Sequence, residues 1–232
     1  MQEHTVKAFD AEIGQLRGLV SEMGGRAEAA IEGAMIALVK HDSKVAADVI
    51  ANDKLIDALE LEIERLAIQI IALRAPMAND LREVVAALKI ASVLERIGDY
   101  AKNIAKRTML IGNLGKIEPL VLIPAMAEIA GQMVHDVLDA FGARDADAAL
   151  LVSETDIKVD GFFNSVFRSL VTHMMENPTT ISNAAHLLFV ARNIERIGDH
   201  ATNVAEMVYY AATGAHMPER EKLAFGDTEQ GG

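Results

Sequence analysis

The sequence predicts an all-α protein of two tandem three-helix bundles, six long helices in all, related by internal duplication. Small and unbranched apolar residues are plentiful, aromatic residues make up only 4% and Trp is absent, which favours close helix packing over sheets. Apolar residues recur at alternating spacings of three and four, the pattern of a helical heptad seam. A third observation is a phrase that occurs twice, ERIGDYAKNIA at 95–105 and ERIGDHATNVA at 195–205.

The expected helices follow from this periodicity and from the breaks between periodic segments. In the second helix the seam starts with Ile56, Leu59 and Ile63, and in the third it includes Leu94 and Ile97. Three long helices in each half, joined by short connections, form an up-down-up bundle. The expected helices span residues 4–41, 44–74, 77–111, 119–141, 145–175 and 180–212.

Breaker residues between these segments are few. HDS at 41–43 ends the first helix and offers Asp42 and Ser43 as N-cap candidates for the second. Pro76, in RAPMAND, disfavours helical conformation at the residue before it and so ends the second helix. The remaining breaks are GNLGKIEP at 112–119, FGARDAD at 141–147 and ENPTTISN at 176–183.

The longest of these breaks divides the chain into two repeats. We expect the first three-helix repeat at 1–112 and the second at 117–214, because GNLGKIEP is the best internal linker. Residues 215–232, which end in GDTEQGG, are expected to form a disordered tail.

Composition and charge exclude several classes of function. The chain has no cysteine, which excludes disulfides, thiolate zinc sites and cysteine nucleophiles. Its formal net charge of -12 disfavours binding to nucleic acid or to anionic membranes and favours cations and basic protein surfaces. The N-terminus does not resemble a signal peptide, and no apolar stretch approaches the roughly 20 residues that span a bilayer. We therefore expect a cytoplasmic protein.

The duplication is strongest around the repeated phrase. Between residues 88–105 and 188–205, ten of eighteen positions are identical, whereas chance agreement in alanine-rich helices would give two or three. The identical residues of the first copy are Leu88, Ala91, Glu95, Arg96, Ile97, Gly98, Asp99, Ala101, Asn103 and Ala105.

Oxygen-bearing side chains in the phrase share one strip of the helix. Glu95, Asp99 and Asn103 lie at i, i+4 and i+8, so each step drifts by only about 40° around the helix axis. The second copy repeats the spacing with Glu195, Asp199 and Asn203. The heptad assignment directs all six side chains away from the core seam.

The simplest interpretation of such a strip is a solvated helix face. Arg96 could pair with Asp99 at i, i+3, and such a pair contributes about 0.2–0.5 kcal/mol. Against this interpretation, like charges at i, i+4 are mildly destabilising. Each phrase also has a helix-interior glycine, Gly98 or Gly198, which costs about 1 kcal/mol relative to alanine.

The preceding helix of each half carries a matching acidic pair. DKLID places Asp53 and Asp57 at i, i+4, and DIKVD places Asp156 and Asp160 at the same spacing. Adjacent antiparallel helices would bring each pair beside the acids of the repeated phrase, where the carboxylates would repel one another without a cation. Hard oxygen ligands suit Mg, Mn, Ca or iron. The pattern therefore predicts one exposed, carboxylate-rich metal site in each half.

Other chemistries have weaker support in the sequence. No histidine lies three residues after a glutamate, as a ferritin-like di-iron centre requires, and no glycine-rich phosphate loop or nucleophile elbow is found. Cofactor-binding and catalytic residues are therefore expected to be absent, and an enzyme would have to work through the metals alone.

Two three-helix repeats that each end in ERIGDxAxNxA resemble the PhoU family, the phosphate-specific transport system accessory proteins. The resemblance covers roughly residues 5–213. It includes the opening FDAEIGQLRGLVSEMGGRAEAAI, the segment RAPMANDLREVVAALKIASVLERIGDYAKNIAKR and the segment HLLFVARNIERIGDHATNVAE.

The resemblance implies a fold, a site and a role. It implies two similar three-helix bundles, usually in a homodimer, with surface clusters of metal ions such as Mg, Mn or Fe. The implied role is non-enzymatic: the family links the phosphate ABC transporter, through its ATPase subunit, to a membrane sensor histidine kinase and restrains phosphate-starvation genes and uptake. The implied metal-binding residues are Asp53, Asp57, Glu95, Asp99 and Asn103 in the first half and Asp156, Asp160, Glu195, Asp199 and Asn203 in the second.

Two alternatives remain open from the residues alone. Carboxylate-bound metals can activate water, so a metal-dependent phosphoester hydrolase is one of them. A metal-buffering helical protein is the other.

Overall fold

The computed structural model describes residues 2–111 and 121–218, without the side chains of residues 2–8. Its described residues form six α-helices and one short 3-10 helix and contain no strand, which confirms the all-α prediction. The elements are α1 (Gln2–Lys40), α2 (Ser43–Arg74), α3 (Asn79–Thr108), α4 (Leu122–Ala143), α5 (Ala146–Glu176), η2 (Pro178–Thr180) and α6 (Ile181–Thr213).

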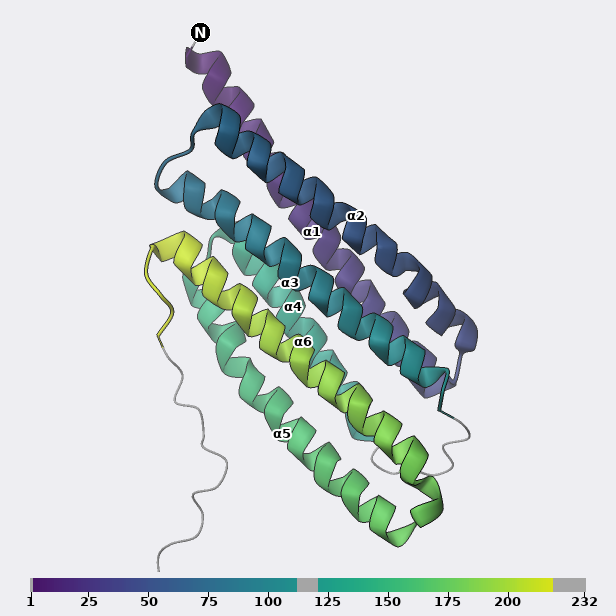
Figure 1. The fold of residues 1–232 in the computed structure, drawn as a ribbon. Helices are drawn as coiled ribbons and strands as arrows, with labels where there is room; N and C mark the ends of the chain where they lie inside the picture. The colour runs from purple at the N-terminus through teal and green to yellow at the C-terminus, as the bar shows by residue number, and fades with distance from the viewer. Residues whose placement is uncertain (1, 112–120, 219–232) are drawn as a thin grey trace, which may run out of the picture.

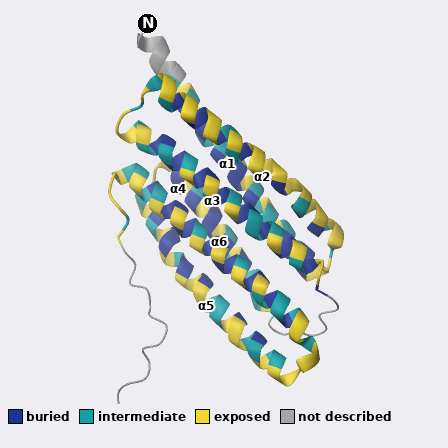
Figure 2. Ribbon diagram, viewed as in Figure 1, coloured by how far each residue is buried: buried dark blue, intermediate teal, exposed yellow. Residues whose placement is uncertain are grey.

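The helices form two layers with a shared core. Figure 1 shows α2, α3, α6 and α5 side by side in one layer, with α1 and α4 behind them. The inner faces bury one continuous apolar cluster that draws on all six helices, including Leu16, Ile63, Leu94, Met133 and Ile194. Figure 2 shows these buried residues as stripes along each helix, as expected for amphipathic helices.

Local sequence signals set most of the helix boundaries. Asp42 caps α2 as predicted, because its carboxylate accepts hydrogen bonds from the backbone N–H groups of Lys44 and Val45 at 2.9 and 3.1 Å. Asp145 caps α5 in the same way through Ala148. The break before Pro76 is also confirmed, since Ala75 leaves the helix in the left-handed region with φ 47°.

The predicted helix ends differ from the structure by a few residues. Helix α3 begins at Asn79 rather than 77, because Ala78 takes φ 49° and cannot be part of a right-handed helix. Helix α4 begins at Leu122 rather than 119. The predicted linker at 112–119 and the tail beyond residue 218 lie outside the described residues.

The two halves contact each other along the helices that carry the repeated phrases. Helices α3 and α6 run antiparallel in the centre of the front layer (Figure 1). Tyr100 and His200, which occupy equivalent positions of the repeat, meet edge to face with ring centroids 5.2 Å apart. The Arg196 guanidinium lies 5.8 Å from the centroid of the Tyr100 ring. The duplicated segments therefore contact each other directly across the junction of the two halves.

The repeated glycines allow close approach of neighbouring helices within each half. A Cβ atom on Gly98 would lie 2.8 Å from Ile56 Cδ1 on α2. On Gly198 it would lie 3.0 Å from Asp156 Oδ1 and 3.3 Å from Val159 Cγ1 on α5. The helix-propensity cost of each glycine is thus explained by packing against the preceding helix.

Replacement of Gly198 by valine should therefore destabilise the protein. Because α5 leaves no room for a branched side chain, we expect Gly198→Val to lower the free energy of unfolding by about 1–3 kcal/mol. Urea unfolding followed by far-UV circular dichroism measures the change. Gly161→Val, in a helical position with nothing within 4 Å, is the matched control and should stay within about 0.5 kcal/mol of the parent. Equal losses in both variants would contradict this account.

Candidate functional site

Carboxylates of α2 and α3 come together in a first acidic strip, which we define as Asp53, Asp57, Glu60, Glu95 and Asp99. A lysine of α3 lies inside the strip. The Lys102 ammonium donates to Asp53 Oδ2 at 2.5 Å and to Asp99 Oδ1 at 2.6 Å, so it joins the two helices. Although burial opposes the shift, these two carboxylates raise the pKa of Lys102. The ammonium is thus held charged between them.

Glu95 lies in the most crowded part of the first strip. Burial raises its pKa to about 6, and the negative charges of Asp99, Glu60 and Asp57 add to the shift. The shared contact of Lys102 with Asp53 and Asp99 shows that carboxylates of α2 lie close to those of α3, as the spacing of the two motifs predicted.

The second acidic strip consists of Asp156 and Asp160 on α5 with Glu195 and Asp199 on α6. Burial raises the pKa of Glu195 to about 7; Asp199 adds to this shift, whereas Arg192 opposes it. Glu195 Oε1 accepts a hydrogen bond from Arg192 at 2.6 Å. Its other oxygen, Oε2, is buried without a hydrogen-bond partner among the described residues.

The expectation that the acids of both strips are exposed was wrong for three of them. Asp53, Asp156 and Glu195 are only 8%, 5% and 9% exposed. A heptad seam identifies the side chains that face one partner helix, but α3 and α6 each pack against several helices. Positions on the flank of the seam therefore lie in the groove toward the preceding helix and become buried.

The two asparagines of the predicted site do remain at the surface. Asn103 and Asn203 are exposed, as are Asp57, Asp160 and Asp199. Each strip thus runs from a buried end, near the glycine of the repeated phrase, to a solvated end.

The arginines of the repeated phrases do not form the pairs that a purely solvated face would use. Among the described residues, no carboxylate oxygen lies within 4.0 Å of the guanidinium of Arg96 or Arg196. Instead Arg196 lies over Tyr100. His200 Nδ1–H donates a hydrogen bond to the Arg196 carbonyl oxygen at 2.9 Å. Burial lowers the pKa of His200 and the charges of Arg96 and Arg196 lower it further, although this hydrogen bond opposes the shift. A basic and aromatic centre thus separates the two strips.

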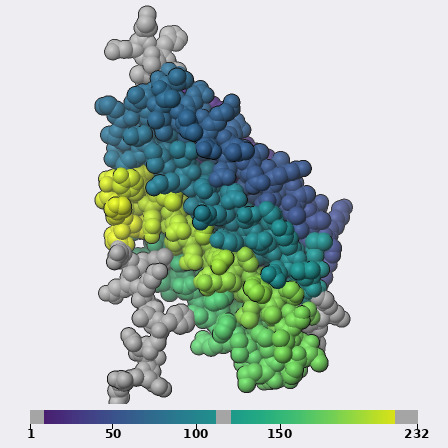
Figure 3. Space-filling view, in the orientation of Figure 1, coloured from purple at the N-terminus to yellow at the C-terminus, as the bar shows by residue number. Residues whose placement is uncertain are grey.

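Sequence reasoning missed this centre. The counterpart of His200 in the first copy is Tyr100, so the histidine is not part of the duplicated pattern. The duplication could have predicted this contact, since antiparallel packing of the two copies of the phrase brings equivalent positions together. Figure 3 shows α3 and α6 side by side in the middle of the front face.

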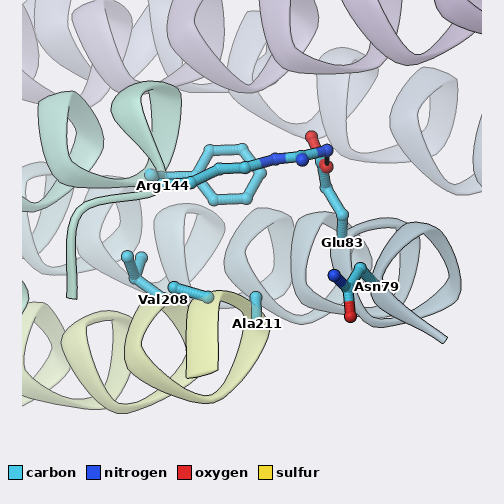
Figure 4. Close-up of a pocket in the computed structure, with 7 residues that line it drawn as sticks. Asn79, Glu83, Arg144, Val208 and Ala211 are labelled. Carbon is cyan, nitrogen blue, oxygen red and sulfur yellow. Dashed lines mark hydrogen bonds and ion pairs between the residues drawn. The ribbon is translucent and has the colours of Figure 1, made fainter. Parts of the chain in front are cut away.

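A small cavity of about 60 Å³ lies at another place, between the first turns of α3 and the end of α6. Figure 4 shows Arg144 extending toward the carboxylate of Glu83, with Asn79, Val208 and Ala211 beside them. Glu83, which is 4% exposed, pairs with both Arg144 and Arg17. Since the carboxylate already has two guanidinium partners and the space holds about two waters, we interpret this cluster as a structural tie between the halves.

The donor chemistry of both strips suits a hard cation, but the side chains are not arranged as a finished site. Within residues 9–111 and 121–218, no three histidine or carboxylate side chains converge in a way that could hold a metal ion. The buried Oε2 of Glu195 fits a bound cation in the second strip. In the first strip, the Lys102 ammonium already lies between the carboxylates.

Comparison with known protein families identifies the repeat. The sequence model of the PhoU domain matches residues 20–108 and 123–208, one match in each half. The chain belongs to the PhoU family. A relative from Zymomonas mobilis subsp. mobilis, described as a phosphate-specific transport system accessory protein PhoU homolog, is 54% identical over 219 residues, which cover 94% of this chain and 92% of the relative.

Other PhoU proteins agree over similar lengths. A relative with the same description from Caulobacter vibrioides is 45% identical over 228 residues, or 96% of this chain and 98% of its own. The crystal structure of PhoU from Pseudomonas aeruginosa superposes with a TM-score of 0.85 at 37% identity and covers 89% of this chain and all of that one. The PhoU fold thus extends over both repeats. In the described residues, no helix is apolar over a long enough stretch to cross a membrane.

The raised pKa of Glu195 predicts a pH dependence of stability in the presence of a chelator. Since the folded state holds the proton more tightly than the unfolded chain, the parent loses stability as pH rises from about 4.5 toward 7. Glu195→Gln removes this loss, so its free energy of unfolding relative to the parent should improve by about 1–3 kcal/mol across that range.

Urea unfolding at several pH values, with EDTA present, measures this difference. Glu206→Gln, at an exposed position of the same helix, controls for the loss of one acidic charge. If the difference in free energy of unfolding between Glu195→Gln and the parent stays constant with pH, the raised pKa of Glu195 is contradicted.

Proposed function

We propose that the protein is a regulatory accessory protein of a phosphate-specific transport system, which restrains phosphate uptake and phosphate-starvation genes when phosphate is plentiful. The observation that carries the proposal is the identity of 54% with a protein of that description over nearly the full length of both chains. Both repeats are included in the match, so the likeness extends over both bundles and not over one alone.

The charge of the molecule supports a role in protein contact. The chain carries 34 acidic and 22 basic residues. Both acidic strips belong to helices of the front layer (Figure 1), the first to α2 and α3 and the second to α5 and α6. Such a surface attracts basic patches on partner proteins and accelerates association with them. We propose that the partners are the ATPase subunit of the phosphate ABC transporter and a membrane sensor histidine kinase, and that the protein acts as a cytoplasmic homodimer that reaches the membrane only through them.

The same surface supports the binding of metal ions. We propose that hard cations such as Mg, Mn or Fe bind at the acidic strips, where carboxylates from two helices supply oxygen ligands. Asn103 and Asn203, which extend the strips at the surface, are the proposed amide ligands. Burial and, after it, repulsion from neighbouring carboxylates raise the pKa values of Glu95 and Glu195, and a bound cation would offset the repulsion.

Removal of the gene should release the phosphate-starvation response. In phosphate-rich medium we expect a strain without this protein to express a phosphate-starvation reporter at a high level, because the proposed restraint on the kinase is lost. Expression of the parent chain should restore repression. A variant with Asp99→Asn and Asp199→Asn, matched to the parent in abundance by immunoblot, shows whether the strips take part. Unchanged reporter expression after deletion would overturn the proposed function.

The proposal also predicts that the purified protein has no phosphoesterase activity. With a panel of phosphoesters and Mn or Mg, we expect release of phosphate at the background rate. The Asp99→Asn, Asp199→Asn variant is the control for contaminating enzymes. A rate that the parent shows and the variant loses would instead establish a metal-dependent hydrolase. Binding of many metal ions per chain, with a normal phosphate response in the deletion strain, would favour metal buffering.

A further inference from the structure

A groove runs between α1 and α4, the two helices that lie behind the other four (Figure 1). At one end the two helices touch, because a Cβ atom on Gly24 of α1 would overlap the side chain of Leu138 on α4. Farther along they separate, since a Cβ atom on Gly131 of α4 would reach only to 4.0 Å from Ile31 Cγ2 on α1. The helices therefore diverge, and a groove with a volume of about 490 Å³ opens between them.

The floor of this groove is apolar. Ile31 and Met35 of α1 and Ala127 of α4 line it and are only 3%, 8% and 3% exposed. Gly131, which also lines the groove, has no side chain and so leaves the space above Ile31 open. On α4 the lining extends from Pro124 to His135, about 16 Å along the helix axis. This length matches about three turns of a helix laid into the groove.

The two walls of the groove are acidic. Glu28 and Glu32 of α1 line one side, one helical turn apart, and Glu128 of α4 lines the other. Among the described residues that line the groove, His135 is the one side chain that can carry a positive charge, and its Nδ1 lies 3.3 Å from Glu28 Oε2. Helix α4 contains no lysine or arginine between Leu122 and Ala143. An apolar stripe with basic residues on both sides is therefore complementary to the groove.

The same charges disfavour other occupants. A second copy of the chain brings a net charge of -12 toward the acidic walls, and residues 219–232 of the chain itself contain more acidic than basic residues. Nucleic acids and anionic lipid surfaces are repelled for the same reason.

We propose that the groove between α1 and α4 binds an amphipathic helix of about three turns from a partner protein. Apolar side chains of that helix fill the space above Ile31 and Gly131, and lysine or arginine residues on its two flanks pair with Glu32 and Glu128. The proposal rests on the partner-binding part of the proposed function. It gives one partner contact a place on the rear of the molecule, away from the acidic strips of the front layer.

Binding of a synthetic peptide to the purified full chain tests the proposal. The probe is a fluorescently labelled helical peptide of about fourteen residues, with leucine at every third or fourth position and lysine on both flanks of the leucine stripe. We expect fluorescence anisotropy to show saturable binding that weakens as salt is added. A peptide of the same composition in scrambled order should bind at least about tenfold more weakly, because its leucines do not share one face.

Two glycine substitutions in α4 test the floor of the groove. Gly131→Leu fills the groove, so we expect peptide binding at least about tenfold weaker than in the parent. Gly142→Leu, in the same helix but outside the groove, has nothing within 4 Å of its Cβ position and should leave binding unchanged. Far-UV circular dichroism and urea unfolding establish that both variants fold.

Charge reversal tests the walls of the groove and does not depend on the glycine variants. Glu128→Lys should weaken binding of the lysine peptide by about tenfold or more. Glu206→Lys makes the same change of net charge at an exposed position of α6, in the front layer, and should weaken it by less than about twofold.

Several results would overturn the proposal. No binding by the parent is one, and unchanged binding in Gly131→Leu is another. Equal losses in Glu128→Lys and Glu206→Lys would show that the peptide responds to overall charge or binds the front layer. Light scattering assigns the groove to a second copy if Gly131→Leu changes the oligomeric state. Binding only after removal of residues 219–232 assigns it to that segment.

These outcomes are separate from the regulatory role, which the reporter experiment in cells decides. A deletion strain with a normal phosphate response would overturn the proposed function, yet the peptide would still bind the groove. Loss of the peptide site would leave the reporter result unchanged.

Discussion

The close approach of two helices at one glycine in each half is the constraint on which the site depends. Gly98 and Gly198 carry no Cβ, so α2 and α5 pack tightly against the helices of the repeated phrases. This approach brings an aspartate of the preceding helix into a groove beside a glutamate and an aspartate of the phrase. The groove buries part of the acidic charge, and the resulting repulsion and desolvation raise the pKa values of Glu95 and Glu195.

Much of the fold could be predicted because the deciding signals are local. The cap at Asp42 and the break before Pro76 depend on neighbouring residues, and both were read correctly from the sequence. The start of α3 could not be read in this way, since nothing in the sequence requires Ala78 to take a positive φ. The acidic motifs were paired correctly across helices because their spacing fixes the side of the helix on which they lie.

Burial of the acids could not be predicted from the same periodicity. A heptad describes the contact with one neighbour, whereas Glu195 lies in the groove toward α5, beside the seam. The contact of Tyr100 with His200 depends on the antiparallel packing of α3 against α6, which is a property of the tertiary fold. The contact of Lys102 with Asp53 could not be predicted for a related reason, since Asp53 lies 49 residues away in the chain. Such a contact has no signature in the spacing of one helix.

Duplication gave the chain two grooves with the same backbone, and substitution then made them different. The packing glycine, the glutamate and the aspartate are the same in both phrases, so the shape of the groove and most of its charge persist. At one position the grooves differ, because Lys102 contacts Asp53 and Asp99 on both helices, whereas the Thr202 hydroxyl donates to the Asp199 carbonyl of its own helix. The first pair of helices is thus joined by an ion pair between them, whereas in the second groove Arg192 pairs with Glu195 of its own helix.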